Sequence, residues 1–401
     1  MTRSLSPGGL HKLHELMAAH VESGQVPGLI SLVAIGDDVH VDVLGTTALD
    51  ETAPLQRDAI FRIASLSKPI TAAATMALVD DGTLQLDRPV DDLLPELANR
   101  RVLRAVDAEL DDTVPATRSI TVEDLLSFRM GIGIVVAMPM STPIQRAEAA
   151  LDLKSMGGPP WPPTSMNVDE WMAGLGSLPL VHQPGEVWMY NTGSQVLGVL
   201  LARATGKDLQ TVLRERVFEP VGMPDTGFTV PADQVHRLPT YYSPDPETGE
   251  MSVIETRADS WWAQRPSFPD ASGMLVSTID DYWAFVSMLL AGGMSSGGRV
   301  LSEQSVQLMT TDRLTAAQRD AAAVPFLEGG GWGLGMAAPA ADQAGLPLPV
   351  GFGWNGGSGT VWRTNPENGV TGILLTQRAM TSPEPPAVFQ DFWSGVNAAI
   401  A

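Results

Sequence analysis

The 401-residue sequence contains no cysteine, so disulfides, thiol nucleophiles and cysteine metal sites are all excluded. Basic residues are also scarce, because 25 lysines and arginines stand against 46 acidic residues and give a formal net charge of -21. Nucleic acids and anionic membrane surfaces are bound through basic patches. The composition therefore argues against both kinds of partner.

Long apolar runs are missing as well. The sequence has no stretch of about 18 apolar residues, the length that crosses a bilayer. Its polar start, Met1 to Gly8, lacks the apolar core of a signal peptide. These absences predict a cytoplasmic protein. A hydrophobic content of 44% is enough for the core of two domains, or of one domain with a large insertion.

Lysine is the rarest of the charged residues, and one of the few lysines stands in a suggestive place. Lys68 follows Ser65 by three positions, where the apolar segment 60–64 meets a run rich in Ala, Leu and Met that ends at Gly82. Residues three apart share one face of a helix, so the amine would lie beside the hydroxyl and could relay its proton. The free amides of the helix start would also favour an oxyanion. Alternatively, Ser65 only caps the helix.

Apolar patterns predict strands at both ends of the chain and helices between them. The expected strands are 29–35, 39–44, 331–337, 350–354, 359–363 and 370–377. The expected helices are 9–22, 65–82, a short one after Thr121, 146–153, 194–204, 209–218 stopped by Pro220, 278–290, 302–310 and 387–400.

This order predicts an α+β fold, in which one antiparallel sheet is assembled from both chain ends and flanked by the terminal helices. An all-helical region is inserted into it. We expect residues 1–62 and 250–401 to form the sheet domain, residues 63–249 to form a mainly helical domain, and the active site to lie between them. The Pro-, Met- and Trp-rich segment 131–180 and the pair Trp261-Trp262 are expected to cover the pocket and set its size.

Two further segments could serve a serine nucleophile. Tyr190 is one of only four tyrosines and stands in the turn-rich segment 184–193, just before an apolar helix; Tyr241 and Tyr242 are expected in a polar loop. The segment Phe352–Thr360 is rich in glycine, which lets the backbone approach a ligand closely. Each also has an ordinary interpretation, as a half-buried aromatic residue and as a tight hairpin.

Together, these three segments resemble the serine β-lactamase and penicillin-binding-protein superfamily, and most of all its class C-like esterases, called family VIII. The resemblance covers nearly the whole chain. It rests on the following motifs in their order: Phe61–Ser65, Leu125-Leu126-Ser127, Pro184–Tyr190, Val196-Leu197-Gly198, Gly273–Asp281 and the Trp354 segment.

The resemblance implies a β-lactamase-like fold and a role for each site residue. Ser65 would be the nucleophile, Lys68 its proton partner, and Tyr190 the general base that later returns the proton to the leaving group. The backbone N–H groups of Ser65 and Gly357 would form the oxyanion hole. No metal or cofactor is implied, and the oligomeric state is left open.

The sequence departs from the family pattern at two places. Thr192 stands where the family has the Asn of Tyr-x-Asn, and Trp354-Asn355-Gly356 replaces the usual Lys-Thr-Gly. That lysine holds the carboxylate of a β-lactam or peptide, so a tryptophan favours a neutral ester.

We therefore expect a short-chain carboxylesterase whose substrate contacts Thr192, Trp354, Asn355 and Gly356. An amidase, peptidase, acyltransferase or weak β-lactamase on the same scaffold remains an alternative. So does a penicillin-binding-type sensor without turnover.

Other candidate sites have weaker sequence support. Ser295 lies in a Gly-x-Ser-x-Gly pattern, but this follows a helix, whereas a nucleophile elbow needs a strand before it. His11 and His14 share a helix, yet two histidines on a polar face are usually solvated rather than metal-bound. A Ser-His-Asp triad is also disfavoured, because His182 is the only histidine near a candidate segment.

Overall fold

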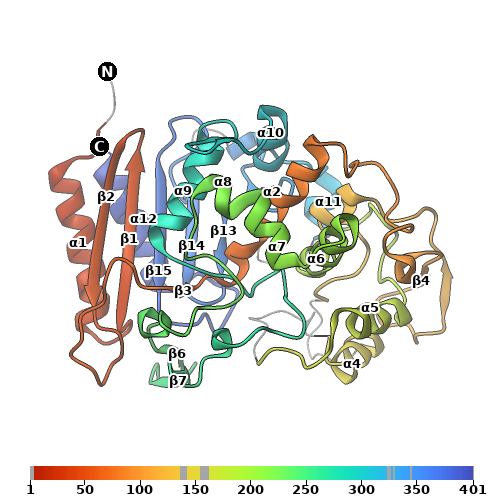
Figure 1. The fold of residues 1–401 in the computed structure, drawn as a ribbon, viewed down its shortest axis with the longest axis horizontal. Helices are drawn as coiled ribbons and strands as arrows, with labels where there is room; N and C mark the ends of the chain where they lie inside the picture. Colours follow the sequence, from red (N-terminus) through yellow and green to blue (C-terminus); the bar gives the residue numbers. More distant parts are fainter. Residues whose placement is uncertain are drawn as a thin grey trace.

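The fold is organised around a seven-stranded antiparallel sheet, described in a computed structural model that covers residues 4–135, 142–153, 162–322, 327, 330–343 and 346–400. The strands run in the order β11-β12-β13-β14-β15-β1-β2 (Figure 1). Their bounds are β11 Gly331–Trp332, β12 Ala337–Ala338, β13 Phe352–Gly356, β14 Thr360–Thr364, β15 Thr371–Thr376, β1 Gly28–Ile35 and β2 Asp38–Gly45. The register pairs Leu29 of β1 with Thr376 of β15, which confirms a sheet built from both chain ends.

The terminal helices cover one face of this sheet. Helices α1 (Pro7–Glu22) and α12 (Ala387–Ala399) pack on each other and on β1, β14 and β15 around an apolar core. Glycine makes their close approach possible, because a Cβ on Gly9 would lie 2.2 Å from the Ala398 carbonyl oxygen.

The opposite face of the sheet carries the larger core. Here α2 (Ser67–Asp80) is buried from Ser67 to Leu78, and α9 (Ile279–Leu290) packs beside the sheet (Figure 1). The remaining helices are α3 Val122–Leu126, α4 Pro143–Ala150, α5 Val168–Ser177, α6 Thr192–Thr205, α7 Leu209–Leu213, α8 Glu219–Val221, α10 Glu303–Thr310 and α11 Ala316–Ala321. Among the described residues, every helix is too short or too polar to cross a lipid bilayer.

Several local predictions need correction. The helix expected to stop at Pro220 continues through a π-helical turn, Arg214–Phe218, and ends at Val221, where Gly222 adopts a left-handed φ of 87°. Tyr241 and Tyr242 lie in a buried strand rather than in a polar loop. That strand, β6 (Tyr241–Pro244), pairs with β7 (Met251–Glu255). Their flanking residues are polar because only one face of this small hairpin is covered.

Several elements were not expected, among them α5, α11 and a short hairpin. Strands β4 (Arg101–Leu103) and β5 (Thr113–Pro115) pair into a hairpin, and each has three residues, too few for an alternating pattern. Of the segment expected to cover the pocket, the structure describes α4, α5 and their flanks. Residues 136–141 and 154–161, with the Met138-Pro139-Met140 run, lie outside the described residues.

Candidate active site

Ser65 lies in a tight turn between a strand and a long buried helix. Strand β3 (Phe61–Arg62) leads into the 3₁₀ turn Ala64–Leu66, and α2 begins at Ser67. Ser65 thus precedes the α-helix instead of opening it. Ala64 has a φ of 43°, an unusual value for a residue with a side chain. The turn is fixed by Ser67, whose hydroxyl donates to the Ala64 carbonyl at 2.6 Å and accepts from the Leu275 amide at 3.1 Å.

The side chain of Lys68 makes a direct polar contact with this serine. Its Nζ lies 2.9 Å from Ser65 Oγ and donates to the Ser272 carbonyl oxygen at 2.8 Å. The side chain is 1% exposed, and this burial lowers the pKa of Lys68 to about 7, although the charge of Asp270 acts in the opposite direction. An amine that is partly neutral near pH 7 can accept a hydroxyl proton.

Tyr190 faces the same pair. The Lys68 Nζ lies 4.6 Å from the centroid of its ring, and its hydroxyl accepts a hydrogen bond of 2.6 Å from the indole Nε1 of Trp354. Burial raises the pKa of Tyr190 far above its ordinary value, while hydrogen bonds to Ser65 and Trp354 partly oppose this. The phenol therefore keeps its proton at neutral pH, which favours a role as proton donor over one as initial base.

Aromatic side chains enclose Tyr190. The ring centroids of Tyr190 and Trp354 are 5.4 Å apart, those of Trp354 and Trp332 4.8 Å, and those of Trp332 and Phe128 4.7 Å. Trp188 completes this aromatic cluster, 5.7 Å from Tyr190. The wall of the site is therefore apolar on the side of Tyr190 and rigid in its geometry.

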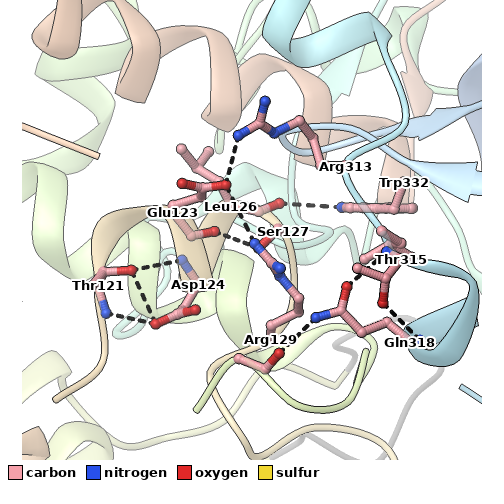
Figure 2. Close-up of polar contacts among 12 residues, drawn as sticks. Thr121, Glu123, Asp124, Leu126, Ser127, Arg129, Arg313, Thr315, Gln318 and Trp332 are labelled. Carbon is pink, nitrogen blue, oxygen red and sulfur yellow. Dashed lines mark hydrogen bonds and ion pairs between the residues drawn. The ribbon is translucent and has the colours of Figure 1, made fainter. Parts of the chain in front are cut away.

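A polar network lies around Trp332, one member of the aromatic cluster (Figure 2). The Trp332 indole donates to the Leu126 carbonyl at 3.2 Å, and Glu123 of α3 pairs with both Arg129 and Arg313. Gln318 of α11 donates to the Gly185 carbonyl at 2.7 Å, which anchors the loop that leads to Tyr190. The backbone N–H of Ile134 then binds the carbonyl of Tyr190 itself at 3.0 Å.

The glycine-rich segment meets the serine turn directly. A Cβ on Gly356 would lie 2.5 Å from the Ile63 carbonyl oxygen, so only glycine lets the end of β13 pack there. The carbonyl of Gly357 accepts from the Met380 amide at 2.8 Å. Within the described part of the chain, the amides of Ser65 and Gly357 donate to no backbone carbonyl. Both amides are therefore available to a developing oxyanion.

Two predicted substrate contacts have other surroundings. Asn355 lines a separate cavity of about 350 Å³ beside α12, with Trp393 and Asn397. Successive side chains of a strand point to opposite faces, so Asn355 cannot share the orientation of Trp354. The expected contact of Asn355 with substrate stays a prediction, and it would have to be made from a different face of β13 than that of Trp354. Thr192 is fully buried in the first turn of α6, and its hydroxyl has no hydrogen-bond partner among the described residues.

The rival candidates are separated from this centre. Ser295 belongs to the hairpin of β9 (Met294–Ser295) and β10 (Gly298–Arg299), where its hydroxyl donates to the Pro220 carbonyl at 2.6 Å. His14 pairs with Asp42, while His11 pairs with Glu15. His182 lines a cavity of about 370 Å³ with Arg104 and Glu186.

Sequence reasoning missed the Ser272 carbonyl, Asp270 and Trp332. Ser272 acts through its backbone, which no residue type signals. Trp332 follows a run of three glycines and could have been noticed as a bulky side chain beside residues that let the backbone pack closely. Asp270 stands 202 positions after Lys68 in the sequence, and no local pattern connects them.

The fold and the site define a class of protein: a β-lactamase-like scaffold in which a buried lysine lies beside a serine at the start of a long helix. The sequence profile of the beta-lactamase family matches residues 13–389. The chain therefore belongs to the beta-lactamase family, whose members include esterases, acyltransferases and penicillin-binding proteins.

Individual relatives extend this comparison. Protein Rv1367c of Mycobacterium tuberculosis is 38% identical over 364 residues, which cover 89% of this chain and 87% of the relative. Esterase EstB of Burkholderia gladioli is 27% identical over 88% of this chain and 86% of its own. Among solved structures, EstCE1, a hydrolase with promiscuous acyltransferase activity, aligns with a TM-score of 0.79 at 22% identity. It covers 97% of this chain and 99% of its own, and shows the same fold.

Proposed function

We propose that this protein is a serine carboxylesterase, which cleaves short-chain esters through an acyl-enzyme on Ser65. One observation carries the proposal: the Lys68 amine lies 2.9 Å from the Ser65 hydroxyl, and its pKa is lowered to about 7. A base with this pKa next to a hydroxyl is the arrangement that activates a serine at neutral pH.

Acylation begins when the neutral Lys68 takes the proton of Ser65 while Oγ attacks the ester carbonyl carbon. The carbonyl oxygen becomes an oxyanion, which the amides of Ser65 and Gly357 stabilise. When this tetrahedral intermediate collapses, its bond to the alkoxide breaks. The alkoxide takes the phenol proton of Tyr190, and the Lys68 ammonium then gives its proton to Tyr190. The alcohol leaves neutral, and both side chains recover their starting states.

Deacylation repeats these steps with water. Lys68 takes a proton from the attacking water, a second tetrahedral oxyanion forms, and its collapse expels Ser65 Oγ. The Lys68 ammonium then returns the proton to the serine, and the carboxylic acid leaves the site.

The nature of the wall supports a neutral ester as substrate. Trp354 occupies the position at which a lysine would hold a carboxylate, and its indole N–H is already bonded to Tyr190. The neighbouring side chains, Trp188 and Trp332, are apolar and buried. A β-lactam carboxylate would lose its hydration there without gaining a cation, so β-lactam hydrolysis is expected to be slow.

The proposal is tested by the Ser65→Ala variant with p-nitrophenyl acetate and butyrate. We expect kcat/KM to fall at least about 10³-fold with an unchanged circular dichroism spectrum. Intact mass after treatment with a fluorophosphonate should show one adduct on the wild type and none on the variant. Full activity of Ser65→Ala would refute the assignment, and an adduct without any turnover would favour a sensor.

The acceptor of the acyl group is tested in the same assay. Esterases and acyltransferases share the acyl-enzyme and differ in whether water or an alcohol removes the acyl group. Product analysis in the presence of a primary alcohol should show mainly the free acid. A dominant transesterification product would move the protein to the acyltransferases.

A further inference from the structure

The loop of residues 270–275 lies against Lys68 and presents a carbonyl group to it. The Ser272 carbonyl oxygen accepts from Lys68 Nζ at 2.8 Å, while the amide of the same residue donates to Asp270 Oδ1 at 2.7 Å. Thr71 of α2 fixes the loop from the side, because its hydroxyl donates to the Ala271 carbonyl at 2.9 Å. The lysine and the aspartate therefore contact opposite sides of one residue, Ser272.

Asp270 is itself a buried charge without an adjacent cation. It is 2% exposed, and its Oδ2 accepts from the Gln195 side chain of α6 at 2.8 Å. Among the described residues, no lysine, arginine or histidine forms an ion pair with it, and Lys68 has no carboxylate in direct contact. The Asp270 carboxylate and the Lys68 ammonium are thus buried near each other, and each compensates the charge of the other.

The other charged groups on the helices around α2 are paired away from Lys68. Asp80 accepts from Ser302 and Ser305, Arg216 pairs with Asp81, and Arg203 of α6 pairs with Glu96. Tyr190 presents its ring face to the lysine. Among the described residues, Asp270 is the charged group that acts on the pKa of Lys68, and it opposes the effect of burial.

We infer that Asp270 is a positioning residue for Lys68, which fixes the Ser272 carbonyl under the ammonium and stabilises the ammonium charge through the intervening peptide. The kinetic part of this inference rests on the proposed function, whereas the electrostatic part does not. During turnover Lys68 becomes positively charged each time it takes a proton from Ser65 or water. A fixed negative charge stabilises that state without occupying the amine.

The matched test is Asp270→Asn. The new amide can still accept from the Ser272 N–H, and rotation of Gln195 can present its Oε1, which has no partner among the described residues, to the new N–H group. Shape and hydrogen bonds are therefore retained while the charge is removed. Asp281→Asn is the control, because Asp281 is a buried carboxylate of α9 that accepts from the Asp225 amide and Thr226 hydroxyl, both at 2.8 Å.

The chain contains only four lysines, so the titration of Lys68 can be read directly by NMR with lysine labelled at the ε-carbon. The Lys68→Arg variant assigns its resonance. We expect this resonance to titrate near pH 7 in the wild type, at least about one pH unit lower in Asp270→Asn, and without change in Asp281→Asn. An Asp270→Asn titration within about 0.3 units of the wild type would overturn the inference.

Kinetics supply the second readout. The low-pH limb of kcat/KM should move in the same direction as the resonance, and Asp270→Glu, which restores the charge, should move it back. If Asp270→Asn does not fold, Asp270→Ser removes the charge and keeps an acceptor for the Ser272 amide. A shifted resonance in a protein without esterase activity would refute the proposed function alone. A Ser65-dependent esterase whose lysine does not shift would refute the inference alone.

Discussion

Arg62 and Lys68 are both buried cations, close together in the sequence, but their surroundings differ. Arg62 donates to Glu255 at 2.8 Å and to the Pro239 carbonyl at 2.5 Å, and it lies over the rings of Tyr241 and Trp262. Lys68 contacts a hydroxyl, a carbonyl and a ring face, and no carboxylate of the described part of the chain touches it. Arg62 therefore stays charged as part of the structure, whereas the proton of Lys68 can leave at neutral pH.

The difference shows how the serine turn can be held rigidly although it lies beside Lys68, a group that must change its charge. The Arg62–Glu255 pair joins β3, just before the serine turn, to the β6–β7 hairpin, and the Ser358 hydroxyl also donates to the Arg62 carbonyl. The turn is thus held from one side by a permanent ion pair. On its other side it meets an amine whose charge is poorly stabilised, and this is what makes the amine reactive.

Of the variants that test the difference between Arg62 and Lys68, Lys68→Met should have the largest effect. We expect kcat/KM for p-nitrophenyl esters to fall by about 10³-fold or more, because Lys68 is the proposed base and Tyr190, which is also bonded to Ser65, keeps its proton at neutral pH. The same variant should be at least as stable as the wild type at pH 7 in urea unfolding, since it removes a buried amine. Retention of more than a third of the activity would exclude Lys68 from the mechanism.

The pH dependence of stability is a second test of the buried Lys68 amine. The pKa of Lys68 is about 7 in the folded state and about 10.4 in an unfolded chain. The unfolded state therefore binds more protons between these values, so this residue makes the free energy of unfolding rise with pH by roughly 4 kcal/mol over that window. The rise should be measurable by urea unfolding at pH 7, 8.5 and 10, and it should be missing from Lys68→Met.

Arg62→Met should have the opposite effect on stability to Lys68→Met. Removing one member of a buried pair leaves Glu255 uncompensated, so we expect a loss of about 3–5 kcal/mol in the free energy of unfolding. The double variant Arg62→Met/Glu255→Met should recover part of that loss. Where Arg62→Met stays folded at low temperature, Lys68 should titrate as in the wild type. A shifted titration would show that the charges of Arg62 and Lys68 interact.

Trp354→Phe tests the donor to Tyr190 with the ring retained. Loss of one hydrogen bond to the phenol should lower kcat about tenfold with little change in KM, because the bond orients Tyr190 and does not bind substrate. Trp332→Phe, which loses a bond to a backbone carbonyl elsewhere, is the control. A rise in KM without a fall in kcat would assign Trp354 to substrate binding instead.

The smallest effect is expected for Ser295→Ala. Its hydroxyl serves the β9–β10 hairpin, so kcat/KM should stay within about twofold and stability should fall by about 1 kcal/mol. Loss of activity in this variant alone would mean that the nucleophile lies there and not at Ser65.

Local patterns predicted the residues that act through short sequence separations. Ser65 and Lys68 are three positions apart, so helical geometry alone brings them together, and the strands at both chain ends predicted the sheet. Asp270 and Glu255 could not be predicted as partners, because each meets its cation about 200 positions away in the sequence. The orientation of Asn355 could have been predicted from the sequence, because successive side chains of a strand point to opposite faces and Asn355 directly follows Trp354.

The pairing of β1 with β15 also has a consequence for synthesis of the protein. Strand β1 lies between β2 and β15, so a strand made at the start of translation waits for residues 371–376 before its second edge is covered. The Gly357 amide and Trp354 lie in the same late segment. A nascent chain would therefore carry Ser65 and Lys68 long before it carried Gly357, and the proposed oxyanion hole would be complete only with the last strands.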